Sequence, residues 1–371
     1  MIYLDNAATT RPDPAVLAAM ARAEEDFGNA SSVHRLGVAA AKAVERARAA
    51  LAQALSARPE EIVFTSGGTE ANNLALKGAA LARGRRGQIV VSAVEHPSVL
   101  EPARALQRLG WGLKVVGADR DGLVDPAAVA AALSSRTVLV SVMHANNEVG
   151  TLQPLAEIGR LCRRRGILFH TDASQSFTKE PLDPRRLGAD LVTLSGHKIH
   201  GPKGVGALYV RAGVQLEPLL HGGGQEGGLR SGTYNTAGIL GFGAAVALAQ
   251  ASDARRMRGL RDRLQARLGA LIPGLRSNGH PRRRVCGILS VTLPKARSTE
   301  LLQALSSAGV CVSAGSACAA AAEHPSHVLL AMGRSAEQAG RSLRLSLSRW
   351  TTAADVERAA RLIAKLAGGR R

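Results

Sequence analysis

The residues most able to do chemistry lie in two short motifs. SGHKIHGPKG, at 195–204, places Lys198 beside a serine and a histidine directly after an apolar run. Upstream, HTDASQS places Asp172 and Gln175 after the apolar run ILFH. An amine and a carboxylate at neighbouring strand ends are what a pyridoxal 5′-phosphate site requires, because the amine bonds to the cofactor and the carboxylate keeps its pyridine nitrogen protonated. The motifs together predict such a site.

A third motif, FTSGGTEANN, predicts where a phosphate would bind. It follows the apolar run EIVF and turns at two glycines into a helical pattern. Backbone N–H groups at a helix start point outward and attract anions, so Gly68 and Thr69 are expected at the cofactor phosphate. Each motif alone is weak, since an aspartate at a strand end is more often a cap. The interpretation depends on the three motifs occurring together.

The elements that must position these motifs alternate along the chain. Between about residues 60 and 210, short β-branched runs alternate with Ala/Leu-rich helical patterns, which is typical of an α/β domain around a mostly parallel sheet. After two long helical patterns at 237–270, the pattern changes to a smaller α+β unit. We expect a large cofactor-binding domain at 12–254. Residues 1–11 and 255–371 would form a small domain, with a loop at about 311–325.

The four cysteines fit no metal site. Their spacings match neither a zinc ribbon nor a dense disulfide framework. Cys162, Cys286 and Cys311 lie in apolar patterns and are expected to pack as small core residues. Cys318 differs, because SAGSACAAAA surrounds it with small side chains that neither pack nor activate it.

Two further classes are disfavoured by composition. The first residues, MIYLDNAATT, lack a secretory pattern, and the longest apolar stretch, at 237–251, is too short to span a bilayer, so we expect a cytoplasmic protein. The net charge of +19 suggests nucleic-acid binding, but the basic residues are scattered and aromatic residues make up only 3%. Direct nucleic-acid binding is the distant alternative.

Taken as a set, the motifs resemble those of the cysteine desulfurases. The resemblance is to the NifS/IscS-like branch of the class V aminotransferases, which have the fold-type I architecture of pyridoxal-phosphate enzymes, and it extends almost throughout the chain. The matching motifs, in the family's order, are YLDNAATT, TSGGTEANN, EHPSV, MHANNEVG, HTDASQS, SGHKIHGPKG, HGGGQEGGLRSGT, SAGSAC and RLSLS.

The resemblance implies how the cofactor is held. Lys198 would bond to it and later act as the base at the substrate Cα, while Asp172 contacts the pyridine nitrogen. Gln175 would bond to the ring hydroxyl, and His96 would stack on the ring. Thr233 would reach the phosphate of the other subunit, which implies a homodimer. The remaining cofactor-binding residues that it implies are Gly68, Thr69, Asn147, Ser195 and His197.

The resemblance also implies a reaction. Asn147 and Arg344 would bind the carboxylate of L-cysteine, with Asn146 left open as an alternative to Asn147. Cys318 would take the substrate sulfur as a persulfide, leaving alanine, so that the catalytic residues are Cys318, Lys198 and His96. Acceptor proteins for iron–sulfur cluster assembly or thiolation would then receive the sulfur. Selenocysteine lyase and aminotransferase activity are the alternatives on the same cofactor.

Overall fold

A central sheet positions most of the predicted motifs. The computed structural model of the chain describes residues 1–25, 27–315 and 325–368. Within these ranges the largest sheet has seven strands in the order β2-β8-β7-β6-β5-β3-β4. All neighbours pair in parallel except β8, which is antiparallel to β7 and β2. The strands are β2 (Ile62–Thr65), β3 (Gln88–Ser92), β4 (Gly112–Val116), β5 (Thr137–Ser141), β6 (Leu168–Asp172), β7 (Leu191–Ser195) and β8 (Gly206–Val210).

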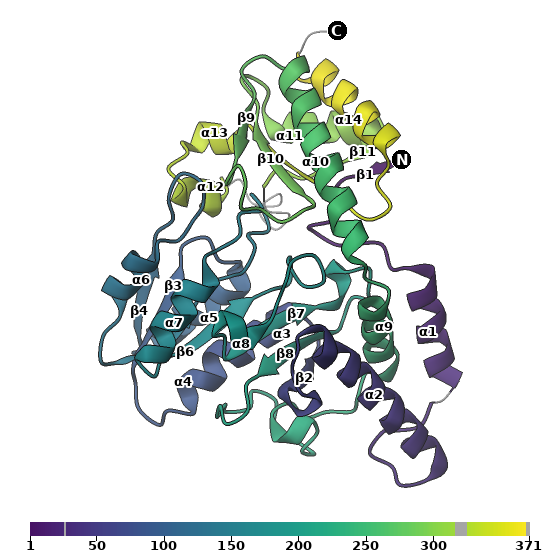
Figure 1. The fold of residues 1–371 in the computed structure, drawn as a ribbon, viewed down its shortest axis with the longest axis vertical. Coiled ribbons are helices and arrows are strands. Elements are labelled where there is room, and N and C mark those ends of the chain that lie inside the picture. Colours follow the sequence, from purple (N-terminus) through teal and green to yellow (C-terminus); the bar gives the residue numbers. More distant parts are fainter. Residues whose placement is uncertain (26, 316–324, 369–371) are drawn as a thin grey trace.

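Helices cover both faces of this sheet, as Figure 1 shows. Its strands are apolar on both sides: Val90 belongs to one buried cluster, whereas Ile89 and Val91 belong to the other. Such two-sided burial is expected of parallel strands. The helices around the sheet are α1 (Pro14–Glu25), α2 (Arg35–Ala54), α3 (Gly68–Asn73), α4 (Ala79–Leu81), α5 (Pro97–Arg108), α6 (Pro126–Ala132), α7 (Leu155–Arg164), α8 (Pro184–Leu187) and α9 (Thr236–Ala247). The π-helical η2 (Leu74–Gly78) joins α3 to α4, and short 3-10 turns form η1 (Pro59–Glu61), η3 (Gly196–Lys198) and η4 (Glu226–Gly228).

The chain ends build a second, smaller layer at the top of Figure 1. β10 (Ile288–Thr292) lies between β9 (Arg276–Asn278) and β12 (Ser342–Ser346), antiparallel to both. The N-terminal β1 (Ile2–Tyr3) pairs in parallel with β11 (Val310–Cys311). A separate apolar cluster joins Ile2 and Leu4 to these strands and their helices. These helices are α10 (Ala251–Leu271), α11 (Ser298–Ser307) and α14 (Ala353–Leu366). The short helices α12 (His327–Ala331) and α13 (Ala336–Gly340) instead add Val328, Leu329 and Ala339 to an apolar cluster of the large sheet.

The expected domain limits, 12–254 and 1–11 with 255–371, stay a prediction. In the fold, position 254 lies inside α10 and not in a linker. In the described ranges no single helix is long and apolar enough to cross a membrane; α9 and α10, bent by 75° at their junction, pass that test of length and composition only as a pair.

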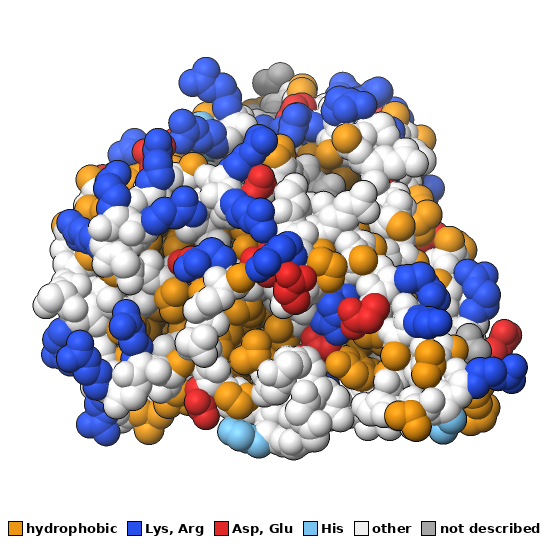
Figure 2. Space-filling view, turned by 60° about the horizontal axis from the view of Figure 1, so that its bottom comes forward, with side chains coloured by type: hydrophobic (Ala, Val, Ile, Leu, Met, Phe, Trp, Pro, Cys, Tyr) orange, Lys and Arg blue, Asp and Glu red, His pale blue; other side chains and the backbone are white. Residues whose placement is uncertain are grey.

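The basic and cysteine residues are distributed largely as the sequence suggests. On the face in Figure 2, lysine and arginine side chains occur in many separate groups, with hydrophobic and neutral side chains between them. Cys162 and Cys286 are fully buried free thiols. Cys311 is only partly buried, because β11 lies at the edge of a two-stranded sheet. Cys311 is therefore less buried than the expected core position requires.

Candidate active site

The ends of β6 and β7 open into a cavity of about 280 Å³. The start of α3 and the N-terminal segment around Ala7 close other sides of it. The cavity is lined by most of the predicted site residues, namely Gly68, Thr69, His96, Asn147, Asp172, Gln175, Ser195, His197, Lys198 and Arg344. Ligands of α/β sheets bind at this kind of edge, beyond the carboxyl ends of the strands.

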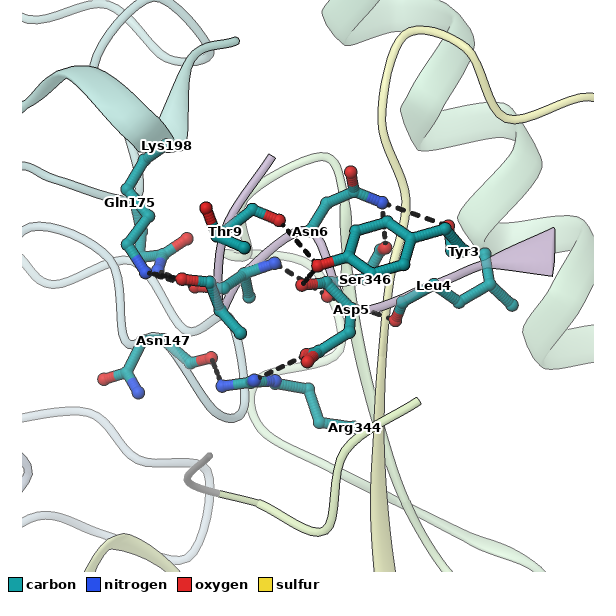
Figure 3. Close-up of polar contacts among 12 residues, drawn as sticks. Tyr3, Leu4, Asp5, Asn6, Thr9, Asn147, Gln175, Lys198, Arg344 and Ser346 are labelled. Carbon is teal, nitrogen blue, oxygen red and sulfur yellow. Dashed lines mark hydrogen bonds and ion pairs between the residues drawn. The ribbon is translucent and has the colours of Figure 1, made fainter. Parts of the chain in front are cut away.

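Lys198 is the last residue of η3, which follows β7 directly. Its Nζ donates hydrogen bonds to the carbonyl oxygens of Ala7 and Ala8, at 2.6 and 2.7 Å (Figure 3). The pKa of this amine is lowered to about 7, chiefly by burial and then by the positive charges of Arg344 and Lys179. Asp172 and Asp5 oppose the shift. An amine with this pKa is partly neutral near pH 7, and only the neutral amine is nucleophilic.

Asp172 ends β6 and is 6% exposed. Its Oδ2 accepts a hydrogen bond from Asn72 Nδ2 at 2.8 Å, and its Oδ1 accepts one from the Ser174 amide at 2.8 Å. Asn72 comes from α3 and also donates to Ser98 Oγ at 2.8 Å. These contacts fix the plane of the carboxylate that faces the cavity.

Gln175 and His96 approach the cavity from different loops. Gln175 Nε2 donates to the Ala7 carbonyl at 2.9 Å, and its buried Oε1 has no hydrogen-bond partner among the described residues. His96 caps α5, because its Nδ1 accepts from the Ser98 amide at 3.1 Å. Burial lowers the pKa of His96, and the charge of Lys198 adds to the shift. A neutral ring with an accepting Nδ1 is left with its Nε2–H as a donor.

The predicted phosphate-binding residues form a cradle. Gly67 caps α3 with φ 154°, a conformation that favours glycine. A Cβ on Gly68 would lie 3.2 Å from Ser174 Oγ and 3.5 Å from Ser195 Cβ, so a larger residue would fill the space. Burial, followed by the charge of Lys198, lowers the pKa of His197 to about 4.

Arg344 in β12, with 1% exposure, is the largest fully buried side chain in the part of the chain that the structure describes. Figure 3 shows its guanidinium held by Asp5, at 2.8 Å, and by the carbonyl oxygen of Asn147, at 3.0 Å. Its Nε has no partner among the described residues. Asn147 lines the cavity, whereas the Asn146 side chain is buried in the turn, where Nδ2 donates to the Val94 carbonyl and Oδ1 accepts from the amide of Glu148.

Comparisons with known proteins agree with this architecture. The aminotransferase class-V family model matches residues 2–359. The cysteine desulfurase IscS of Anaeromyxobacter sp. (strain Fw109-5) is 46% identical over 370 residues, which cover 98% of this chain and 91% of that relative. This chain belongs to the cysteine desulfurases of the class-V aminotransferase family.

Solved structures place this family member among NifS-like folds. A NifS-like protein superposes with a TM-score of 0.92 at 37% identity and covers 98% of both chains. A structure described as SspA in complex with cysteine superposes with a TM-score of 0.86 at 36% identity, over 95% of this chain and 100% of that one. The predicted fold class, an α/β fold-type I enzyme with a mostly parallel sheet, is thereby confirmed.

One predicted residue of this desulfurase-family chain is not among those that line the cavity, and another falls outside the described residues. Thr233 is exposed, in the segment that follows η4. Cys318 lies outside the described residues. Their predicted roles, at the partner's phosphate and as the sulfur acceptor, stay predictions.

Four residues at or behind the cavity of this family member were not predicted from sequence. Asn72, Asp5, Glu148 and His327 contact predicted residues or line the cavity. Asn72 and Glu148 stand inside the quoted motifs TSGGTEANN and MHANNEVG, so position in a motif was a usable signal. Asp5 lies in YLDNAATT, but only the fold brings it to Arg344.

The residues present fit the cofactor that the resemblance implies. A cradle at Gly68 that a Cβ would fill suits a phosphate, and the buried Asp172 carboxylate suits a protonated ring nitrogen. The unpartnered Oε1 of Gln175 can accept a hydrogen bond from a ring hydroxyl. Lys198 supplies the amine. Pyridoxal 5′-phosphate satisfies all four groups.

Proposed function

We propose that this protein is a pyridoxal-phosphate-dependent cysteine desulfurase that converts L-cysteine into L-alanine and takes the sulfur onto Cys318. The observation that supports this most directly is that side chains from separate elements meet in one cavity. Lys198, Asp172 and Arg344 come from three different strands or strand ends, yet all line one cavity. The cofactor, when bound, withdraws electrons from the substrate Cα and so weakens the bond between Cβ and Sγ.

The side chains divide the remaining work. The neutral Lys198 amine can remove the Cα proton and return a proton to the carbon fragment, since its pKa of about 7 suits both transfers. The Arg344 guanidinium is fixed, because Nη1 donates to the Asn147 carbonyl and Nη2 to Asp5. Its Nε has no partner among the described residues, so the guanidinium can bind the substrate carboxylate. The neutral imidazole of His96, which lines the cavity, would lie against the ring of the bound cofactor.

Sulfur transfer balances without an added oxidant. The thiolate of Cys318 attacks the substrate Sγ, the Cβ–Sγ bond breaks, and the carbon fragment gains protons to become alanine. L-cysteine and a protein thiol thus become L-alanine and a protein persulfide. Proteins of iron–sulfur cluster assembly or of thiolation are the expected acceptors, in a cytoplasmic homodimer.

A direct assay tests this function. The purified protein, loaded with pyridoxal 5′-phosphate, is given L-cysteine with dithiothreitol, and alanine and sulfide are measured. We expect equal amounts of both products and no production by Lys198→Ala or Cys318→Ser. Alanine formation at the wild-type rate by Cys318→Ser would contradict the proposal and favour another reaction on the same cofactor.

A further inference from the structure

Glu148 is a buried carboxyl group at the active-site cavity that the proposed mechanism leaves without a task. It is 1% exposed and lines the cavity beside Asn147 and His327. Burial raises its pKa, although Ser326, His327 and Arg344 oppose the shift. Burying a carboxyl group costs free energy, so its presence here calls for a reason.

One oxygen of Glu148 contacts the residues that precede α12. Ser326 Oγ donates to Glu148 Oε2 at 2.5 Å, and the same hydroxyl accepts from the Leu329 amide at 3.1 Å as the cap of α12. The serine alone would cap the helix. Capping therefore does not explain the carboxyl group. The other oxygen, Oε1, has no partner among the described residues.

Oε2 of Glu148, the oxygen that accepts from Ser326, also lies close to Gly315. A Cβ on Gly315 would be 3.1 Å from Glu148 Oε2 and 3.4 Å from Ser326 Cβ, and Gly315 has φ 68°. Two residues earlier, Ser313 exchanges two backbone hydrogen bonds with Arg344, at 2.7 and 3.2 Å. Gly315 and Ser326 are therefore neighbours in space at Glu148, next to the residue expected to bind the substrate carboxylate.

Gly315 and Ser326 flank Cys318 in the sequence. We propose that Glu148 is a positioning residue for sulfur transfer, holding Ser326 beside Gly315 so that the stretch carrying Cys318 begins and ends at the substrate cavity. This inference rests on the proposed function. It assigns Glu148 to the transfer of sulfur and not to the binding of cysteine.

The test separates binding from transfer in the holoenzyme. Cysteine affinity is measured from the absorbance change on titration, and sulfur transfer from alanine formed and sulfur carried by the Cys318 peptide in one turnover. We expect Glu148→Ala to slow transfer about tenfold, the equivalent of one lost hydrogen bond in a buried site, while cysteine affinity changes less than about threefold. Ser326→Ala should slow transfer in the same direction.

Two further variants control this experiment. Ser335→Ala removes the matching serine cap from α13, which has the same length as α12 and no carboxyl partner at the cavity, and should leave transfer unchanged. Glu148→Gln keeps a carbonyl oxygen that can accept from Ser326, so its transfer rate should recover towards wild type. Transfer by Glu148→Ala within twofold of wild type would overturn the proposal, as would a Glu148→Gln variant as slow as Glu148→Ala.

A readout independent of activity is hydrogen exchange. Glu148→Ala and Ser326→Ala should both speed amide exchange at 313–315 and 326–331, and Ser335→Ala should not. If both variants exchange faster but the wild-type protein makes no alanine, the desulfurase function is refuted and the contact role of Glu148 stands. Unchanged exchange at both segments would overturn the role of Glu148 even if the enzyme is active.

Discussion

Among single residues, Lys198 has the property on which the proposed chemistry depends most, an unusually acidic ammonium group. Its amine has a pKa of about 7, first because it is buried and then because Arg344 and Lys179 are close. Lys179 lines a smaller cavity of about 50 Å³, which Gln175 and Lys198 also line. Removing the positive charge of Lys179 should make protonation of Lys198 easier.

The first prediction is that Lys179→Met raises the pKa of Lys198. Less repulsion favours the charged amine, so the midpoint of its reaction with an amine reagent should move to higher pH. Labelling of the cofactor-free protein across pH 5–10, with quantification of the Lys198 peptide, measures this midpoint. Lys203→Met, which removes an exposed lysine outside the described contacts of Lys198, is the control. A midpoint that stays or falls in Lys179→Met would contradict the electrostatic explanation.

The second prediction concerns Arg344. Lysine is a point charge without a planar fork, so Arg344→Lys should raise the KM for cysteine roughly tenfold or more and lower kcat less. Steady-state alanine formation measures both constants. Arg341→Lys, which changes an arginine that contacts Pro294 and Glu337 outside the cavity, should leave KM unchanged. A normal KM in Arg344→Lys would exclude Arg344 as the carboxylate ligand.

Many of the site residues were predictable because the short motifs contain the residue types that the chemistry needs. Lys198, Asp172 and Gln175 follow apolar strands in the sequence, and the sheet brings such ends together. Asp5 was missed because its partner, Arg344, lies at the other end of the chain, and only the pairing of the N-terminal segment with β12 joins them. Glu148 was missed although it lies in the motif MHANNEVG, because the sequence does not show that its carboxyl group is buried beside the cavity.

At the scale of elements, one buried ion pair anchors the segment around η4. Arg48 of α2 forms a two-pronged contact with Glu226, at 2.8 and 2.6 Å, and Glu226 Oε2 also accepts from the Phe64 amide. The side chains of Arg48 and Glu226 are 9% and 2% exposed. This pair connects α2 and β2 to the segment that leads to Thr233.

The third prediction is that Arg48→Met destabilises the protein by about 3–5 kcal/mol, because it leaves the Glu226 carboxylate buried and unpaired. Urea unfolding measures the loss. Arg48→Met with Glu226→Gln should be less damaging, since no unpaired charge remains. Arg104→Met, which breaks an exposed pair with Glu101, should cost about 1 kcal/mol or less. Equal losses in Arg48→Met and Arg104→Met would show that the buried pair is not an anchor.

The order of elements was more predictable than their limits. Strand and helix alternation gave the α/β arrangement, since each apolar run is short and flanked by turn residues. The antiparallel β8 and the break between α9 and α10 depend on tertiary packing. A 15-residue apolar stretch could not reveal that the helix ends at Ala247 and that a new one begins at Ala251.

At the scale of the whole molecule, the prediction concerns two copies of the chain. Thr233 is exposed and is not among the residues that line the cavity of its own chain. The resemblance assigns it to the phosphate of a second subunit, which would make two composite sites in one dimer. Closed two-fold symmetry places each exchanged residue in the partner's site.

The fourth prediction is that hybrid dimers regain activity. Lys198→Ala and Thr233→Ala, each alone, should be largely inactive. A purified hybrid of the two carries one site with both Lys198 and Thr233 intact, so it should regain about half of wild-type activity. Two different affinity tags isolate the hybrid. No gain over the separate variants would mean that Thr233 serves its own chain or has no role at the phosphate.

The central claim is that sulfur passes from cysteine to Cys318. The most direct measurement mixes the holoenzyme with a slight excess of L-cysteine, without reductant, and determines alanine and the mass of each cysteine-containing peptide. The account predicts one alanine per active site and one added sulfur on the Cys318 peptide, with none on the peptides of Cys162, Cys286 or Cys311. Alanine without added sulfur on Cys318, or sulfur on another cysteine, would contradict it.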